Sequence, residues 1–144
     1  MTRPIDLSGP LVDVDWLSNH IDHESVRIVD ASFYLPHLNT SFDKEFAAAR
    51  IPGARPFNID LISSAESELP HMLPEAAAFG RAVGALGISN EHTIIAYDTL
   101  GMFSVARAWW MFRVFGHDAV AVLDGGLPAW RAAGHDVDSG PWGG

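Results

Sequence analysis

Short apolar runs alternate with longer helix-forming segments along the whole chain, and this alternation constrains its fold more than any other feature. Residues 93–97 (TIIAY) and 120–123 (VAVL) are apolar at successive positions, as strands buried on both faces require. The segments between the runs are long enough for helical crossover connections. The pattern predicts an α/β fold with a central parallel sheet of about five strands, flanked by helices on both faces.

Capping residues and propensity delimit the other elements. Further strands are expected at 27–31 and 55–59. Asp13, Thr40 or Ser41 and Pro74 suit helix starts, and Gly87 and Gly134 suit helix ends. The predicted helices cover residues 14–21, 42–50, 74–86, 103–115 and 127–133. We expect an N-terminal extension over 1–10, one domain over 11–137 and a linker-like tail over 138–144.

Composition excludes several classes of protein. The 144 residues are 48% hydrophobic and 19% charged, which is the reverse of a disordered chain. A formal net charge of −9 argues against binding nucleic acid, because the phosphate backbone would repel the chain. No signal peptide is evident and no uninterrupted apolar run approaches the length of a membrane span, so we expect a cytoplasmic protein that does not bind membranes.

Each of the four main predicted strands ends at an aspartate. These are Asp30, Asp60, Asp98 and Asp124. Ligands of open parallel sheets collect at the carboxyl ends of the strands. The functional site is therefore expected at this edge of the sheet.

Three segments in this order resemble the rhodanese-like domain family. Residues 48–55 (AARIPGAR) are similar to its first signature, and residues 122–134 (VLDGGLPAWRAAG) to its second. Residues 97–104 (YDTLGMFS) stand where the family has its active-site loop. The resemblance covers roughly residues 11–140 and implies the rhodanese fold.

A closer resemblance is to the N-terminal half of the two-domain 3-mercaptopyruvate and thiosulfate sulfurtransferases. It is carried by residues 58–60 (NID), 71–74 (HMLP) and 107–117 (RAWWMFRVFGH). In those enzymes only the C-terminal domain holds the catalytic cysteine. Arg50 departs from the family pattern, which usually has histidine before Ile-Pro-Gly-Ala.

The family's active-site loop stabilises a thiolate with the backbone N–H groups of a tight turn and with a helix N-terminus. The corresponding loop cradle here is Asp98, Thr99, Leu100, Gly101, Met102 and Phe103. Asp98 stands at the cysteine position, and the chain contains no cysteine. A carboxylate can satisfy the same N–H groups but cannot carry a sulfur atom. Cysteine-dependent phosphatase chemistry is excluded equally, and an aspartyl-phosphate route lacks an adjacent cluster of magnesium-binding acids.

Asp60 and His71 are the sharpest candidates for a functional role. From their spacing alone, Asp60 would cap the following turn, and His71 would form a hydrogen bond within the irregular loop. The resemblance implies instead that both face the catalytic cysteine of the other domain and polarise it, as a histidine oriented by a carboxylate does.

The remaining candidates have simpler interpretations. Arg107 is expected to form an ion pair with a strand-end acid, Asp98 or Asp124, and its alternative role is to bind an anionic substrate. Aromatic residues of the same segment suit core or interdomain packing: Trp109, Trp110, Phe112 and Phe115. His20 and His23 lack a third metal ligand, so we expect no metal and no cofactor.

Two hypotheses follow. In the first, the chain is the non-catalytic N-terminal domain of a sulfurtransferase, inactive alone, whose partner is a second, Cys-bearing rhodanese domain. The two domains would share a cleft for a small anionic sulfur donor. In the second, it is a free-standing module that binds a partner or ligand without catalysis.

Overall fold

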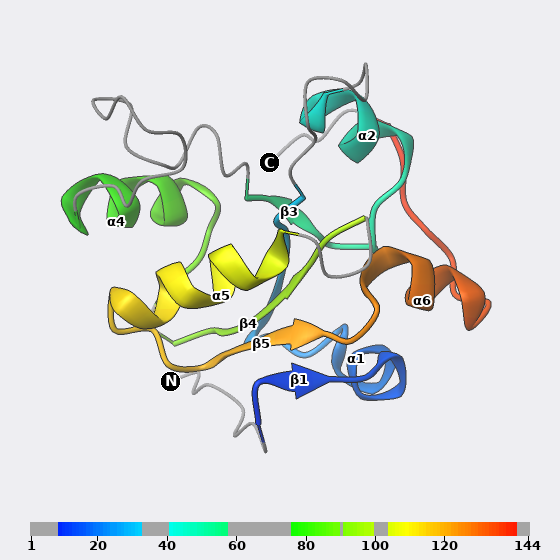
Figure 1. Cartoon of the computed structure of the whole chain (residues 1–144), viewed down its shortest axis with the longest axis horizontal. Coiled ribbons are helices and arrows are strands. Elements are labelled where there is room, and N and C mark those ends of the chain that lie inside the picture. The colour runs from blue at the N-terminus through cyan, green and yellow to red at the C-terminus, as the bar shows by residue number, and fades with distance from the viewer. Residues whose placement is uncertain (1–8, 33–40, 58–75, 90, 100–103, 141–144) are drawn as a thin grey trace.

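The structure, a computed structural model, describes residues 9–32, 41–57, 76–89, 91–99 and 104–140. Five parallel strands form one sheet in the order β1-β5-β4-β2-β3. Helices cover both of its faces (Figure 1). The predicted α/β architecture is confirmed. The strands are β1 (Leu11–Val12), β2 (Val26–Asp30), β3 (Arg55–Pro56), β4 (Thr93–Tyr97) and β5 (Val120–Leu123).

The helices have the predicted positions to within a few residues. Asp13 caps the first of them by accepting a hydrogen bond from the Trp16 N–H at 2.7 Å, and the Ser41 side chain caps the second in the same way. Gly87 and Gly134 follow helix ends with positive φ. The helices are α1 (Val14–His20), α2 (Phe42–Ala48), α4 (Ala76–Ala85), α5 (Val105–Val114) and α6 (Gly126–Ala132).

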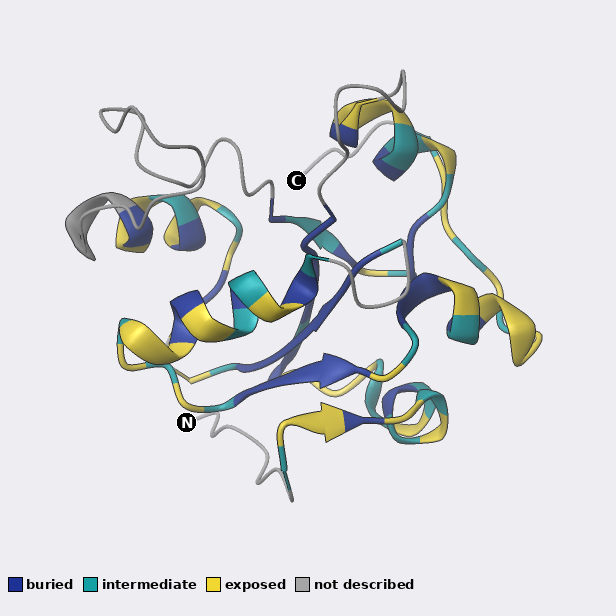
Figure 2. Cartoon of the chain, viewed as in Figure 1, coloured by how far each residue is buried: buried dark blue, intermediate teal, exposed yellow. Residues whose placement is uncertain are grey.

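The core has one layer on each face of the sheet. Helices α4 and α5 pack over one face around Phe79 and Phe112, whereas α1, α2 and α6 pack over the other around Leu17, Phe46 and Trp130. Strands β4 and β5 are buried along their whole lengths, and the helices expose their outer sides (Figure 2). Within the described ranges, no helix is long and apolar enough to cross a membrane.

Strand β1 is not among the predicted elements. It has two residues, of which Leu11 is exposed, so it lacks the longer apolar run of β2, β4 and β5. Its pairing is with residues far along the chain, Leu11 with Val122 and Val12 with Leu123. Strand β1 therefore forms because it pairs with β5 in the folded chain, and not because of a local sequence signal.

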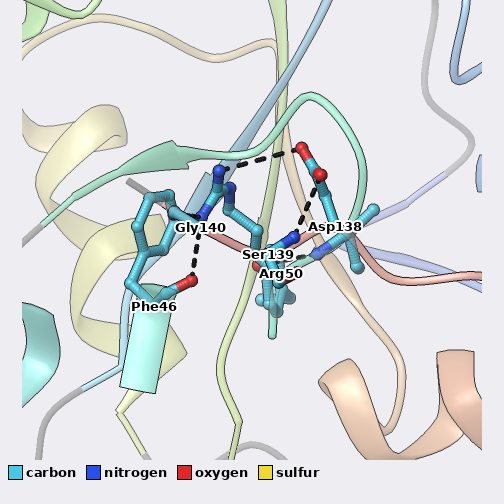
Figure 3. Close-up of polar contacts among 7 residues, drawn as sticks. Phe46, Arg50, Asp138, Ser139 and Gly140 are labelled. Atoms are coloured by element: carbon cyan, nitrogen blue, oxygen red, sulfur yellow. Dashed lines mark hydrogen bonds and ion pairs between the residues drawn. The ribbon is translucent and has the colours of Figure 1, made fainter. Parts of the chain in front are cut away.

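Arg50 binds the first residues of the predicted tail to the domain (Figure 3). Its backbone exchanges hydrogen bonds with Asp138 at 2.9 and 2.7 Å. Its buried guanidinium donates to the carbonyl oxygens of Phe46 (3.0 Å) and Gly140 (2.8 Å), with the Asp138 carboxylate 3.8 Å away. The Gly140 N–H also donates to the Ala47 carbonyl at 2.8 Å. Residues 138–140 are thus bound to α2, although their composition is that of a linker.

Candidate active-site loop at the end of strand β4

Asp98 directly follows β4, and its fully buried carboxylate contacts the start of α5. Oδ2 accepts hydrogen bonds from the backbone N–H groups of Ser104 (2.7 Å) and Val105 (3.1 Å). The first N–H groups of a helix have no partner within the helix, and the helix dipole there favours an anion. The geometry at position 98 therefore stabilises a negative charge.

The remaining residues of the predicted cradle are described only in part. Thr99 is half-buried, and its N–H donates to Ser32 Oγ at 2.9 Å. Ser104 Oγ donates to the Ala31 carbonyl at 2.7 Å. These bonds connect both described ends of the loop to the segment that follows β2. Leu100, Gly101, Met102 and Phe103 lie outside the described residues, as do Asp60 and His71.

Asp30, at the end of β2, is the second buried acid at this edge of the sheet. Its Oδ1 accepts from the Ser32 N–H at 3.0 Å and from Ser32 Oγ at 2.5 Å. Burial raises the pKa of the Asp30 carboxyl to about 6, in spite of the hydrogen bonds from Ser32, and the charge of Asp98 raises it further. Asp124, in contrast, is exposed. Two of the predicted strand-end acids, Asp30 and Asp98, thus lie together in the interior.

The Asp-Gly-Gly turn places α6 against this loop. Gly125 and Gly126 both have positive φ, and the Leu127 N–H donates to the Asp98 carbonyl at 2.9 Å. A side chain on Gly126 would collide with that carbonyl oxygen. An open cavity of about 520 Å³ lies beside Thr99, between α2 and α6, with Glu45 and Arg131 in its lining.

The Ile-Pro-Gly-Ala turn is connected to the same edge of the sheet. The Ile51 N–H donates to the buried Tyr97 hydroxyl at 3.2 Å, and Gly53 adopts a positive φ. Burial raises the pKa of the Tyr97 phenol well above its usual value, so the hydroxyl stays protonated. Both signature segments therefore pack around the ends of β2 and β4.

Arg107 does not form the expected ion pair with Asp98 or Asp124. Its guanidinium lies over the Trp110 ring, 5.0 Å from the centroid, and its Nε is buried without a hydrogen-bond partner in the described part of the chain. On α5, Val105 and Ala108 are buried in the core, whereas Arg107 is only partly buried and lies against Trp110. Asp98 is bonded to backbone N–H groups instead.

The aromatic residues of α5 divide between core and surface. Phe112 is fully buried, whereas Trp110 is 41% and Val114 47% exposed. Among the described residues, no cluster of three or more His, Cys, Asp or Glu side chains could hold a metal ion.

Residues 13–133 match the family described as the rhodanese-like domain. The chain belongs to the rhodanese-like domain family. The chain has a buried carboxylate at position 98, directly after β4, and contains no cysteine. It holds an anion at position 98, but no nucleophilic sulfur.

Similar proteins are sulfurtransferases that are considerably longer than this chain. The chain is 48% identical over 136 residues to thiosulfate/3-mercaptopyruvate sulfurtransferase 2 of Arabidopsis thaliana, covering 94% of this chain and 40% of the relative. It is 40% identical over 121 residues to the 3-mercaptopyruvate sulfurtransferase of Escherichia coli strain K12, covering 83% and 43%. The rhodanese-like domain described here therefore spans less than half of these relatives.

A solved structure supports the same assignment. The crystal structure of SseA from Escherichia coli, a 3-mercaptopyruvate sulfotransferase, superposes with a TM-score of 0.88 at 37% sequence identity. The superposition covers 94% of this chain and 52% of that one. The chain is thus a sulfurtransferase-like rhodanese domain.

Proposed function

We propose that this chain is the non-catalytic N-terminal rhodanese-like domain of a two-domain sulfurtransferase of the mercaptopyruvate or thiosulfate type. The observation that carries the proposal is Asp98, whose carboxylate accepts the hydrogen bonds that a thiolate would need at this position. Coverage of 40–43% of the relatives supports one domain of two. The motif resemblance at residues 58–60 and 71–74 supports the N-terminal half.

In this proposal sulfur transfer takes place on the partner domain. With thiosulfate as the donor, a cysteine thiolate there attacks the sulfane sulfur and the sulfur–sulfur bond of the donor breaks. Sulfite leaves with the electron pair, and the cysteine is left as a persulfide. Asp60 and His71 of this chain face that cysteine and polarise it, and Arg107 is available to bind an anionic donor. The lone domain releases no sulfur, because it has no thiol to accept it.

The exposed apolar side chains of α5 favour this function over a free-standing binding module. A module that acts alone should have polar side chains wherever a second domain would dock. Trp110 and Val114 are instead large, apolar and exposed, one turn apart on the same helix.

The test is a complementation assay. The purified chain should release no sulfur from thiosulfate or mercaptopyruvate, and fusion to a Cys-bearing rhodanese domain should give activity. Asp60→Asn and His71→Ala should then lower kcat, whereas Asp22→Asn, at an exposed position, should not. Turnover by the lone chain would refute the proposal.

A further inference from the structure

Three basic side chains gather away from the Asp98 loop, near the C-terminal end of α4. Arg27 belongs to β2, Arg55 to the edge strand β3, and His92 directly precedes β4. Arg27 Nε donates to the Gly87 carbonyl oxygen at 3.4 Å, and the Arg55 guanidinium lies 3.7 Å from the Cβ position of Gly87. Both guanidinium groups therefore lie beside Gly87. Gly87 belongs to the segment that links α4 to β4, whose course can be followed in Figure 1.

Backbone carbonyls fix Arg27 in place. Its Nη1 donates to the carbonyl oxygens of Glu24 (2.8 Å) and Val26 (3.1 Å), in addition to the bond from Nε to Gly87. Its Nη2 forms no hydrogen bond within the described residues. Arg27 thus presents a fixed guanidinium edge with an unused donor.

The Arg55 side chain has no hydrogen bond or ion pair to another residue in the described ranges. The guanidinium group of this half-buried residue has five N–H donors. None of them has an acceptor among the described residues around Gly87. Burial lowers the pKa of Arg55, and the charge of Arg27 lowers it further. Two like charges are therefore held together in a chain whose net charge is −9.

His92 adds a neutral donor to this group. Its Nδ1 accepts from the Ser89 N–H at 2.9 Å, so the ring proton of the neutral form is on Nε2. Burial lowers the pKa of His92, and the charges of Arg27 and Arg55 lower it further. The neutral ring therefore has an Nε2 donor and adds no third charge at neutral pH.

Among the residues that the structure describes, no carboxylate forms an ion pair with Arg27 or Arg55. The C-terminal end of α4 supplies a negative partial charge of roughly one half, against two guanidinium charges. Glu24 and Glu91 are nearby in sequence and exposed, but neither carboxylate forms an ion pair with Arg27 or Arg55 in the described structure. Donors without acceptors and positive charge without a counter-ion are the conditions for binding an anion.

We propose that Arg27, Arg55 and His92 form a binding site for a small divalent oxyanion, of the class of sulfate, thiosulfate and phosphate. The planar fork of Arg55 matches two oxygens of such an anion, with Arg27 Nη2 and His92 Nε2 as further donors. The site is separate from the Asp98 loop and does not rest on the proposed function.

The proposal is tested by titrating the whole purified chain with sodium sulfate, thiosulfate or phosphate at constant ionic strength, with chloride as the reference. Binding is followed by calorimetry and by the rise in Tm. Saturable binding with one site per chain is expected. The comparison between anions identifies the class of ligand. Tighter binding of sulfate and thiosulfate than of phosphate indicates a site for sulfur oxyanions, whereas equal binding of all three indicates a general oxyanion site.

Variants decide whether these residues form the site. Arg55→Gln should weaken the Kd about tenfold, as expected for the loss of a charge-assisted hydrogen bond. The Arg55 side chain has no hydrogen-bond partner in the described ranges, so its replacement leaves no other residue without its partner. The variant should therefore fold. Arg81→Gln, on the exposed side of α4, makes the same change in charge and should bind like the wild type. The proposal is overturned if the wild type shows no saturable binding beyond chloride, or if Arg55→Gln binds as tightly as Arg81→Gln.

Discussion

Asp98 Oδ2 accepts a hydrogen bond from the Ser104 N–H at 2.7 Å, so the residue after the central strand β4 caps the helix that follows it. The bond spans the loop between β4 and α5. The carboxylate of a strand-end residue thereby provides an acceptor for the unpaired N–H groups at the start of α5.

Removal of this carboxylate should destabilise the domain. Asp98→Ala leaves two N–H groups at the start of α5 without their acceptor, which should lower the free energy of unfolding by about 2–3 kcal/mol. Asp98→Asn keeps one carbonyl acceptor and should cost less. Urea denaturation measures both, with Asp124→Ala at an exposed position as the control. Equal stability of Asp98→Ala and Asp124→Ala would show that the cap contributes nothing.

Asp98→Cys should restore the first half of sulfur transfer. The thiolate attacks the sulfane sulfur of thiosulfate, the sulfur–sulfur bond of the donor breaks, and sulfite leaves with the electron pair, so that a cysteine persulfide remains. Mass spectrometry should detect the addition of one sulfur atom to the variant and none to the wild type. Ser104→Cys at the other end of the loop is the matched control, and absence of an adduct on Asp98→Cys would contradict a preserved cradle.

Gly126 should tolerate no side chain. Its φ is +59°, and a Cβ would meet the carbonyl oxygen of Asp98, so Gly126→Ala should cost about 3 kcal/mol. Gly80 is exposed inside α4 with open space around it, and Gly80→Ala should stabilise by about 1 kcal/mol. Thermal denaturation of the two variants should therefore shift Tm in opposite directions, and a shift in the same direction would contradict this account.

Asp30 should make stability depend on pH. Its pKa is about 6 in the folded chain against 3.8 in the unfolded one, so the folded state keeps a proton that the unfolded state has released. The free energy of unfolding should therefore fall by about 3 kcal/mol in total as the pH rises from about 4 to 6. Above that range the full loss of stability is present.

Asp30→Asn removes the titration and keeps an acceptor for Ser32. The stability of this variant relative to the wild type should increase between pH 4 and pH 7, as measured by urea denaturation at each pH. Asp124→Asn should show no such trend. A constant difference between Asp30→Asn and the wild type would place the pKa of Asp30 near its ordinary value.

Arg50 should hold residues 138–140 against the domain. Arg50→Ala removes the guanidinium bonds to Phe46 and Gly140, which should cost about 2 kcal/mol and speed hydrogen exchange at the amides of Asp138 and Gly140. Arg50→His, with the residue usual in the family, should restore less than the full protection because its ring is shorter. Arg131→Ala, also an arginine but exposed on α6, should leave exchange unchanged.

Several elements could be predicted from the sequence because their signals are local. Strands β4 and β5 have the bounds expected from their apolar runs, and Asp13, Ser41 and Gly134 mark helix ends as their capping chemistry requires. The carboxyl-end acids also follow from the alternation of strands and helices. The resemblance in the two signature segments added the family, which the comparisons confirm.

Side-chain partners were less predictable because they depend on residues far away in the chain. Arg107 faces Trp110 rather than an acid, since the rotation of α5 on the sheet decides its direction. Arg50 has no local signal for its role, yet it binds residues almost ninety positions later in the chain. The meeting of Arg27 and Arg55 at Gly87 likewise requires the neighbouring positions of β2 and β3.

The sequence by itself determined the alternating α/β architecture, the absence of a thiol and the carboxylate at the loop position, because periodicity, composition and residue identity need no tertiary information. Only the tertiary structure decided that the Asp98 carboxylate caps α5, that Asp30 is buried beside it, and that Leu11–Val12 forms a strand. Burial and pairing are properties of the packed chain: a carboxylate acquires its pKa, and a short edge segment its strand geometry, from neighbours that only folding brings together.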